Sequence, residues 1–550
     1  MMRMTLSDAL RNGNRRGVRQ WVLILAGSAL VGAAALLLLA ACEPEKPPGM
    51  IGSVSGFAGA AVADEPRAAV VARDVLSAGG SAADAAVALY FALAVTMPST
   101  AALGGGGVCI VHDADKKTTE VLDFLPRAAP DGRVAVPLAV RGMAALQARY
   151  GKLRWEQLLG PAEQMARLGT PTSRALAREL VTAGARLSQD DEMARIFLHP
   201  DGTPLQEGEP LRQELLGGVL TQLRIKGAGE FYTGTLAHTL TDAAQTLGAP
   251  LTIEALRNAK PEFKPALEVP FGNHTIYLSQ PPAAGGVVFG QLVEMMIDVE
   301  DFAGAPESER PHLVAEASER AFVNRTSWME PDGSSKVDPA TLVTEDYAKM
   351  LMKGYDKGHA TPANPFVAVP ENPWASGFVT ADADGNAVAC NVTMNNLFGA
   401  GRMAPGTGIL LAPAPNDRGA GYRALGPVLL ANKSTGEFFF AGAASGGETA
   451  ATALAQVFVR VAEAKQSLAD AEAAPRFHHN GSPDLVYTES IDRTQSESSL
   501  TQRGHQIQQI DSIGRVNAIW CPKSLQRDSA SCSADADPRA FGLAVVQTDK

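Results

Sequence analysis

The sequence predicts an α+β protein built in stacked layers rather than a parallel, doubly wound sheet. Residues 378–394 show the pattern of a β-hairpin, residues 135–248 are mostly helical, and the C-terminal third alternates strands with one helix at 448–464. Runs of strands, then helices, then strands fit a layered sandwich. Of the 550 residues, 46% are hydrophobic, so the chain has enough apolar material for a large core.

The overall charge excludes one broad class of function. With 48 Lys and Arg against 59 Asp and Glu, the formal net charge is -11. Non-specific nucleic-acid binding needs a basic surface, so we expect no nucleic-acid partner.

The N-terminus is predicted to be an export signal rather than part of the fold. A positively charged n-region precedes an apolar stretch at residues 21–39, which ends Leu39-Ala40-Ala41-Cys42 and resembles a bacterial lipobox. We therefore expect residues 1–42 to be a lipoprotein signal peptide and residues 43–52 a linker. Lipidation of Cys42 would hold the protein on the periplasmic side of a bacterial membrane. A plain transmembrane anchor is the alternative, because the apolar run is nearly long enough to span a bilayer. The n-region contains Arg11, Arg15, Arg16 and Arg19.

The next elements follow in order along the chain. Residues 67–97 carry small and apolar side chains at helical spacing, and four glycines at 104–107 lead into a strand at 108–112. These glycines lack the Lys-Ser/Thr of a phosphate-binding loop, and no GxGxxG precedes a helix, so we exclude nucleotide binding. After the helical middle we expect strands, a helix and an exposed proline-rich loop: residues 267–278, 287–297 and 361–374.

The hairpin is the most informative local pattern. A short apolar strand at 378–381 is followed by the tight turn Asp382-Ala383-Asp384-Gly385 and by a second strand that starts near Asn386. This arrangement predicts two neighbouring antiparallel strands.

The cysteines and histidines indicate no metal site. Cys521 and Cys532 bracket a polar loop and could pair in an oxidising compartment. Cys109 and Cys390 lie in apolar strand patterns, where a free buried cysteine is expected. The nine histidines form no HExxH or His-x-His set, and His478-His479 is expected to serve packing or a turn. We therefore predict no metal.

Three blocks of the sequence resemble the γ-glutamyltransferase family of N-terminal-nucleophile hydrolases. The blocks are residues 79–130, 374–417 and 427–479. The resemblance implies a four-layer αββα sandwich, with a large-subunit-like region at 53–375 and a small, catalytic region at 376–550. It also implies an amide hydrolase or transferase that acts on small γ-glutamyl compounds such as glutathione and needs no metal or cofactor.

An alanine occupies the position of the family's nucleophile. In the family, the precursor cuts itself before a threonine, whose hydroxyl becomes the nucleophile and whose new α-amine acts as its base. Counting back from Asp382 places Ala375 there, with Ser376 beside it. Because side chains alternate along a strand, Ser376 points to the other face unless a bulge or a deletion at Gly377 restores the register.

Three interpretations of this position stay open. In the first, the chain cuts itself before Ser376, which then acts as nucleophile in the smaller of two chains. In the second, the precursor never cuts, and the protein is a catalytically inactive, ligand-binding lipoprotein. The third is an acylase of another amide, because residues that bind the substrate carboxylate have changed.

The resemblance also assigns supporting roles near the nucleophile. Thr393 falls on a threonine that supports the nucleophile. Gly446 and Gly447 fall on a glycine pair whose backbone N–H groups stabilise the oxyanion, a role that pre-aimed donors serve well.

Substrate binding is assigned in the same way. Asn395 and Asp417 fall on residues that hold the α-amino end of the glutamyl group, where a carboxylate makes a charge-assisted hydrogen bond. The family's arginine for the α-carboxylate aligns with Pro126. Arg127 or Arg423 is therefore expected to supply the bidentate contact that a guanidinium suits.

Overall fold

The computed structural model describes most of the chain, in one compact unit within Ser55–Lys550. The described residues are 59–129, 132–249, 251–363, 371–416, 421–489 and 495–546. The predicted signal peptide and linker, with Cys42, lie outside them, and so does Asp417. Within the described ranges, no helix combines the length and hydrophobicity needed to cross a bilayer.

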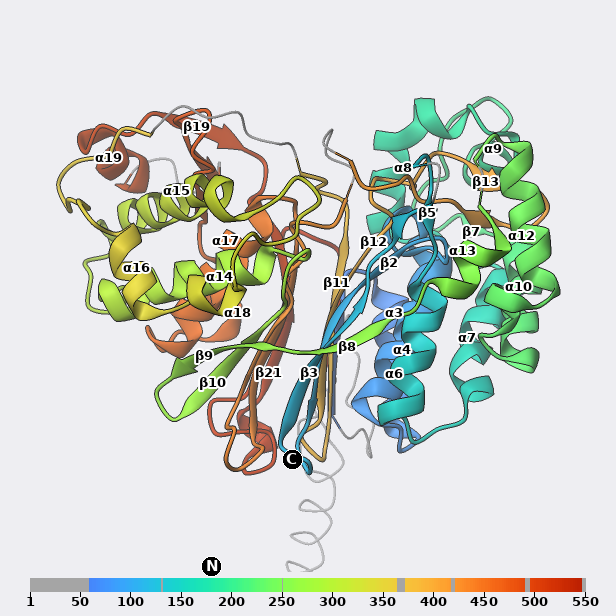
Figure 1. The fold of residues 1–550 in the computed structure, drawn as a ribbon, viewed down its shortest axis with the longest axis horizontal. Helices are drawn as coiled ribbons and strands as arrows, with labels where there is room; N and C mark the ends of the chain where they lie inside the picture. Colours follow the sequence, from blue (N-terminus) through green and yellow to red (C-terminus); the bar gives the residue numbers. More distant parts are fainter. Residues whose placement is uncertain are drawn as a thin grey trace, which may run out of the picture. The chain divides into compact units, whose positions relative to one another are not determined.

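Two antiparallel sheets form the centre of the fold (Figure 1). The first contains β1 (Gly59–Ala63), β2 (Gly106–Asp113), β3 (Thr118–Phe124), β8 (Glu262–Pro265), β11 (Ser376–Asp382), β12 (Ala387–Thr393) and β22 (Leu543–Val546). The second contains β9 (Leu267–Phe271), β10 (His274–Leu278), β15 (Val428–Ala431), β16 (Phe438–Ser445), β20 (Arg515–Trp520) and β21 (Ser533–Ala536). Their strand orders are β22-β1-β11-β12-β2-β3-β8 and β21-β20-β16-β15-β10-β9. An apolar layer that includes Val379, Leu429 and Ile519 fills the space between the sheets.

Helices cover the outer face of each sheet (Figure 1). Against the first sheet pack α3 (Pro66–Ser77), α4 (Ala82–Thr96) and α6 (Ala139–Tyr150), while α7 (Trp155–Leu168) packs on α4 and α10 (Glu214–Lys226) packs on α7. Against the second pack α14 (Gly285–Glu294) and α17 (Thr449–Ala462), and α15 (Arg310–Trp328) packs on α14. The order helix, sheet, sheet, helix confirms the predicted α+β class and the αββα sandwich.

Shorter elements complete the described chain. The further helices are α5 (Pro98–Ala101), α8 (Arg174–Leu187), α9 (Asp191–Phe197), α11 (Glu230–Thr233), α12 (Thr235–Thr246), α13 (Ile253–Asn258), α16 (Glu345–Leu351), α18 (Leu468–Ala473) and α19 (Gln495–Gln502). A π-helical turn (Met295–Val299) follows α14, and 3-10 turns lie at Pro339–Leu342 and Ser529–Ser531. Small sheets are formed by β4 (Arg127–Ala128) with β5 (Ala135–Val136), β6 (Thr170–Pro171) with β7 (Pro210–Leu211), β13 (Met403–Ala404) with β14 (Ile409–Leu410), and β17 (Phe477–His478) with β18 (Val486–Glu489) and β19 (Ile507–Ile510).

Helix α4 shows why a run rich in alanine is found here. All fifteen of its residues are buried, and small side chains let it lie close to both the sheet and its neighbouring helices. Ser81 and Asp84 form a capping box at its N-terminus. Asp84 also accepts the backbone N–H groups of Lys152 and Leu153 at 2.7 and 3.0 Å, which fixes the turn before α7.

The predicted hairpin is confirmed as β11 and β12, and the residues of its turn explain its shape. The carboxylate of Asp382 accepts the backbone N–H groups of Asp384 and Asn386, each at 3.1 Å. Gly385 has φ 89°, a conformation that favours glycine. The same carboxylate accepts the N–H of Ala82 at 2.9 Å and so ties the turn to the start of α4.

Two disulfides cross-link the fold. Cys521 pairs with Cys532, as the sequence allowed. Cys109 pairs with Cys390, so the prediction of free cysteines at these positions is wrong. They lie directly opposite each other on β2 and β12, with Cα atoms 4.1 Å apart. A separation of 281 residues hides this partnership in the sequence.

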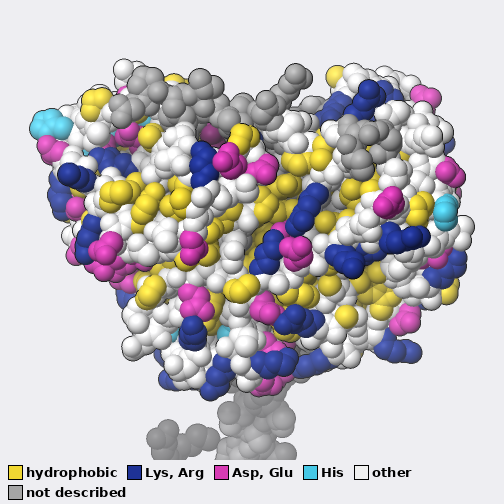
Figure 2. Space-filling model, in the orientation of Figure 1, with side chains coloured by type: hydrophobic (Ala, Val, Ile, Leu, Met, Phe, Trp, Pro, Cys, Tyr) yellow, Lys and Arg dark blue, Asp and Glu magenta, His cyan; other side chains and the backbone are white. Residues whose placement is uncertain are grey.

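Charges of both signs are interspersed on the face drawn in Figure 2, with apolar side chains between them. No single basic patch dominates that face, in agreement with the net charge of -11.

Candidate active site

The first strand of the hairpin, β11, starts at the position that the sequence singles out. Ser376 is its first residue and is completely buried. Its Oγ lies 2.7 Å from Oγ1 of Thr100 and 3.8 Å from Sδ of Met97, both on the side of the helices. Ala375 instead packs in the apolar layer between the sheets. The two neighbouring side chains therefore point to opposite faces of the sheet.

No bulge changes this register. β11 pairs with β12 without interruption from Ser376, opposite Val392, to the turn. Gly377 faces the second sheet, where a Cβ would come within 2.9 Å of the carbonyl oxygen of Ala443. Ser376 therefore has the orientation that strand alternation predicts, and β11 contains no bulge at Gly377.

The carbonyl oxygen of Trp374 lies between two side-chain donors. Nδ2 of Asn372 donates to it at 2.9 Å, and Oγ1 of Thr393 donates at 3.0 Å. Thr393 is held in turn by the backbone N–H of Asn395, which donates to Oγ1 at 3.0 Å. Both donors polarise the peptide bond that precedes Ala375. Because alanine has no hydroxyl, the residue after this bond cannot attack it.

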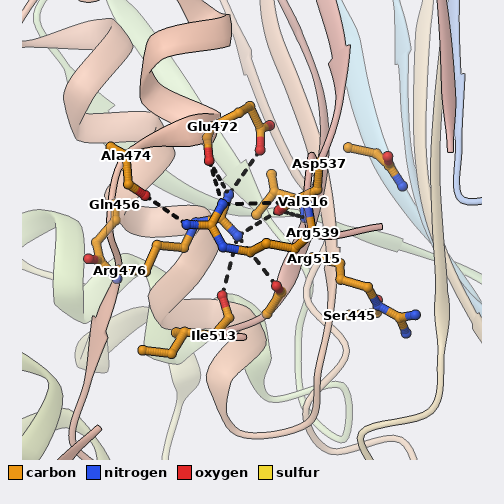
Figure 3. Close-up of polar contacts among 12 residues, drawn as sticks. Ser445, Gln456, Glu472, Ala474, Arg476, Ile513, Arg515, Val516, Asp537 and Arg539 are labelled. Atoms are coloured by element: carbon orange, nitrogen blue, oxygen red, sulfur yellow. Dashed lines mark hydrogen bonds and ion pairs between the residues drawn. The ribbon is translucent and has the colours of Figure 1, made fainter. Parts of the chain in front are cut away.

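The next carbonyl oxygen, that of Ala375, has a different partner. Nη2 of Arg515 donates to it at 3.5 Å. Arg515 begins β20, and its Nε donates to Oγ of Ser445 at 3.1 Å, on the neighbouring strand (Figure 3). A cation therefore faces the peptide bond that precedes Ser376.

Two buried carboxylates flank this arginine. Asp64 accepts the backbone N–H of Gly377 at 3.0 Å and Nδ2 of Asn517 at 2.7 Å. Glu179 accepts from Oγ of Ser99, and its Oε1 lies 3.7 Å from Nη1 of Arg515. Burial raises the pKa of both carboxyl groups, and Arg515 opposes this shift. Buried carboxyl groups with shifted pKa values are candidates for proton transfer when they lie at a cavity.

A cavity of about 280 Å³ opens beside these groups. It is lined by Asp64, Met97, Glu179, Trp374, Gly446 and Arg515, among others. Ser376 contacts Met97, so one side chain separates its hydroxyl from this space. In the described chain, Oε1 of Glu179 has no hydrogen-bond partner, although it is buried against the cavity.

The glycine pair lies next to the same segment. Gly446 and Gly447 connect β16 to α17 with φ 133° and 64°, so other residues would be strained at both positions. Gly446 lines the cavity. A Cβ on Gly447 would come within 3.2 Å of the Glu371 carbonyl oxygen and 3.3 Å of Pro373. The pair therefore sits beside residues 371–374, while its role toward an oxyanion stays a prediction.

A buried ionic network holds the loop that carries Arg515 (Figure 3). Arg476 is 1% exposed and donates to Asp537 at 2.6 Å, to Glu472 at 2.9 Å and to the carbonyl oxygen of Ile513 at 3.2 Å. Arg539 donates to Glu489, whose carboxylate also accepts the N–H of Ile513 at 2.7 Å.

The network reaches the glycine pair through the next residue of this loop. Gly514 follows Ile513, and a Cβ on Gly446 would lie 2.8 Å from its Cα. The network therefore positions both Arg515 and the turn at Gly446.

Asn395, for which substrate binding stays a prediction, lies just after β12 and has one side-chain oxygen left unused within the described chain. It has φ 59°, and its Nδ2 donates to the carbonyl oxygen of Pro413 at 3.0 Å. Its buried Oδ1 has no hydrogen-bond partner among the described residues. This oxygen can therefore accept from a donor such as an ammonium group.

The two candidate arginines for a carboxylate lie around Tyr422. Arg127 is exposed and sits 3.3 Å from Asp123, whereas Arg423 is 7% exposed and donates to the carbonyl oxygen of Pro331 at 2.9 Å. Burial is the main cause of the raised pKa of Tyr422, and both arginines act to lower it. They are therefore within electrostatic range of one phenol, although each already has a protein partner.

Four of these residues have no signal in the sequence. Asp64, Glu179 and Arg515 come from three distant segments and share no motif spacing. Asn372 lies in a stretch expected to be an exposed loop. The side chain of the neighbouring Glu371 is buried against Arg325. Only the fold brings these groups to one strand end.

Comparison with known proteins places this geometry in context. Residues 68–546 match the sequence model of the family described as Gamma-glutamyltranspeptidase. The chain is 27% identical to the glutathione hydrolase proenzyme of Escherichia coli (strain K12), over 87% of this chain and 92% of the relative. It is 28% identical to the acylase ACY 1 proenzyme of Pseudomonas sp. (strain SE83), over 89% and 95%.

Solved structures agree on the fold. A cephalosporin acylase from Bacillus halodurans superposes with a TM-score of 0.78 at 24% identity, covering 93% of this chain and 100% of that chain. The gamma-glutamyltranspeptidase of Helicobacter pylori superposes with a TM-score of 0.52 at 27% identity, covering 57% and 95%.

Proposed function

The chain belongs to the gamma-glutamyltranspeptidase family, and from this premise we propose that it hydrolyses or transfers the acyl group of small γ-glutamyl or related amides, glutathione included. The nucleophile is Ser376, freed by cleavage of the bond between Ala375 and Ser376. The observation that carries the proposal is the contact of Arg515 with the Ala375 carbonyl, the group that Ser376 must attack. The family's relatives named above are enzymes that act on amides.

The cleavage step uses groups that lie beside this bond. Oγ of Ser376 adds to the carbonyl carbon of Ala375, and its proton leaves to a buried carboxylate, Glu179 or Asp64. Arg515 stabilises the negative charge that develops on the carbonyl oxygen. The C–N bond then breaks as the nitrogen of Ser376 takes up a proton, and water hydrolyses the ester. The products are a chain ending at Ala375 and a chain with a free amine at Ser376.

Substrate turnover follows from the same residues. Withdrawal of the new end at Ala375 lets Ser376 reach the cavity past Met97. Its α-amine acts as base, and the acyl group passes first to Oγ and then to water or an amine. Oδ1 of Asn395, which has no hydrogen-bond partner among the described residues, is suited to an ammonium group of the substrate. Arg127 or Arg423 is suited to a carboxylate.

A second candidate function is favoured by the donors on Trp374. Asn372 and Thr393 both donate to the carbonyl group before Ala375, which has no nucleophilic side chain. The hydroxyl of Ser376 is completely buried. A chain that never cuts would keep the family's fold as a ligand-binding lipoprotein. Asp417, the glycine pair and Asn395 would then serve binding alone.

One set of variants separates the two candidates. Ser376→Ala should abolish both chain cleavage and hydrolysis of a γ-glutamyl anilide, and Ser376→Thr should retain cleavage because it keeps a hydroxyl. Thr100→Val serves as the matched control, since it removes the partner of Oγ and leaves Ser376 in place. Equal cleavage in wild type and Ser376→Ala would exclude Ser376 as nucleophile. A folded, uncut wild type that binds γ-glutamyl compounds without turnover would establish the second candidate.

Export and lipid anchoring belong to the same proposal. The apolar run that ends at Cys42 supports transport out of the cytoplasm and attachment to a bacterial membrane on its periplasmic side. Cys42→Ser should abolish labelling by a fatty-acid precursor and release the protein from membranes. Unchanged labelling in this variant would refute the anchor.

A further inference from the structure

Two histidines and a glutamate meet on the outer side of the second sheet, where the proposed reaction has no part. His312 and Glu316 lie one turn apart on α15, and His505 follows α19. All three residues are buried. One possible ligand atom from each lies within 4.8 Å of the others. His505 is 193 residues from His312, so their spacing carries no metal signature.

The hydrogen bonds of His312 decide which nitrogen holds its proton. Nε2 lies 2.8 Å from the carbonyl oxygen of Asp356, which can only accept, so Nε2 carries the hydrogen. In the neutral ring, Nδ1 then presents a lone pair, and it faces Nε2 of His505 at 2.8 Å. Metal-binding histidines are commonly held in this way, with the far nitrogen donating to a carbonyl group.

The carboxylate of Glu316 is oriented just as firmly. Oε2 accepts from Arg320 at 2.6 Å and from Oγ1 of Thr361 at 2.8 Å. Oε1 accepts the backbone N–H of Thr361 at 2.9 Å and lies 3.9 Å from Nε2 of His505. One oxygen is therefore engaged by a cation, while the other keeps a lone pair within reach of the histidines.

We propose that Nδ1 of His312, Nε2 of His505 and Oε1 of Glu316 bind one divalent transition-metal ion, with Zn²⁺ as the best match. Two imidazole nitrogens and a carboxylate oxygen are ligands that Zn²⁺ takes at about 2.0–2.2 Å, and water completes the tetrahedron. Nitrogens in such a tetrahedron are about 3.3 Å apart, so the two rings must separate by about half an ångström. The ion would clip α15 to the segment after α19.

Charge around the site sets the expected strength. Arg320 already pairs with the far oxygen of Glu316, which weakens the attraction of this carboxylate for a cation. We therefore expect micromolar rather than nanomolar binding. A hard cation such as Mg²⁺ prefers oxygen ligands and should not bind to this set.

The test uses the full chain without a histidine tag, freed of metal by a chelator. Titration with ZnCl₂ followed by calorimetry should give one equivalent bound and a melting temperature raised by several degrees, and MgCl₂ should give neither. Glu316→Gln and His505→Ala should each weaken Zn²⁺ binding by about a hundredfold or more. His359→Ala is the matched control, because that side chain is 82% exposed on the turn beside Asp356 and should leave binding unchanged.

A second measurement guards against variants that fail to fold. Co²⁺ bound by the wild type should give the visible absorption of a tetrahedral ion. Absence of stoichiometric Zn²⁺ and Co²⁺ binding by the wild type would overturn the proposal, as would wild-type affinity in a folded His505→Gln. The two imidazoles would then be a hydrogen-bonded pair, in which Nε2–H of His505 donates to Nδ1 of His312.

Discussion

Self-cleavage requires donors on a carbonyl group and a hydroxyl on the residue after it, and two neighbouring peptide bonds differ in which of these they have. The bond from Trp374 to Ala375 has two well-placed neutral donors on its carbonyl, at 2.9 and 3.0 Å, but no hydroxyl after it. The bond from Ala375 to Ser376 has the hydroxyl, but its carbonyl meets one donor of Arg515 at 3.5 Å. The carbonyl group with two neutral donors therefore lies one peptide bond upstream of the carbonyl group that Ser376 can attack.

The comparison shows how much a shift of one residue changes on a strand. Ala375 and Ser376 point to opposite faces, so the hydroxyl has moved from the inter-sheet layer to the helix layer. The donors on the carbonyl before each residue differ as well: Asn372 and Thr393 donate to the carbonyl before position 375, and Arg515 donates to the carbonyl before position 376. We therefore expect cleavage before Ser376 to be slower than cleavage by a hydroxyl placed at 375.

The largest effect on the difference between the two bonds is expected from Ala375→Thr. It places a hydroxyl directly after the carbonyl that Asn372 and Thr393 polarise, so the cut should move one residue upstream. Sequencing of the small chain should then give the introduced threonine as its first residue.

The control for this variant is Ala375→Val, which has nearly the same shape and no hydroxyl. It should fold to a similar degree, because position 375 is buried in both cases, and it should show no cut before residue 375. If Ala375→Thr folds as Ala375→Val does and is not cut between residues 374 and 375, then the two donors on the Trp374 carbonyl do not promote cleavage of this bond.

The ionic network offers a way to disturb the surroundings of the second bond from a distance, through the loop that carries Arg515. Arg476→Met leaves Glu472 and Asp537 buried without this cation, which should lower the free energy of unfolding by about 3–5 kcal/mol. Urea denaturation measures this loss. Since the network holds Ile513 and Gly514, cleavage before Ser376 should also slow. Arg174→Met removes an exposed pair with Glu207 and should leave stability nearly unchanged.

Arg515 tests the second bond alone. Arg515→Gln should slow cleavage before Ser376 by about a hundredfold, the scale expected for one oxyanion donor. The rate is followed by gel electrophoresis of freshly refolded chain. Arg178→Gln changes another arginine of the same cavity that makes no contact with Ala375, and it should cut at the wild-type rate. An equal loss in both variants would argue that the cavity's overall charge matters, rather than this contact.

The smallest expected effect is that of pH. Burial raises the pKa of Asp64 above 3.8 and that of Glu179 above 4.5, so the folded chain binds more protons than the unfolded chain near these values. Stability contributed by the protonated groups should therefore be present at low pH and fall as pH rises above these values. The same ionisation creates the proton acceptor, so cleavage should become faster over the range in which stability declines.

Glu179→Gln sharpens this last prediction. Its amide cannot ionise, so the variant should lose part of the pH dependence of both stability and cleavage. Melting curves and cleavage rates across the acidic range measure the two trends together. Wild type and variant with parallel pH profiles would show that Glu179 does not titrate in this window.

Sequence patterns predicted the parts of the fold that local chemistry specifies. The turn Asp382-Ala383-Asp384-Gly385 predicted the hairpin because the aspartate accepts hydrogen bonds from the turn's own backbone and the glycine adopts the positive φ that the turn needs. The helix expected at 448–464 is found as Thr449–Ala462, since its apolar spacing is regular. The face of Ser376 followed from strand alternation alone.

Local sequence patterns could not predict contacts between segments that are far apart along the chain. Cys109 and Cys390 were expected to be free, because their pairing depends on the register of two strands that lie 281 residues apart. Arg515, Glu179 and the cluster of His312 with His505 were missed for the same reason. The helix expected at 287–297 continues as a π-helical turn at Met295–Val299, a change of winding that apolar spacing does not reveal.

The most direct test of the central claim is the intact mass of the purified wild-type chain, followed over time, with the first residue of any small chain identified. Self-cleavage through Ser376 predicts two chains, of which the larger ends at Ala375 and the smaller begins with Ser376. A folded protein that stays a single chain throughout would contradict the claim. A small chain that begins with Ala375 would contradict it too, because alanine has no attacking group and an outside protease must then have made the cut.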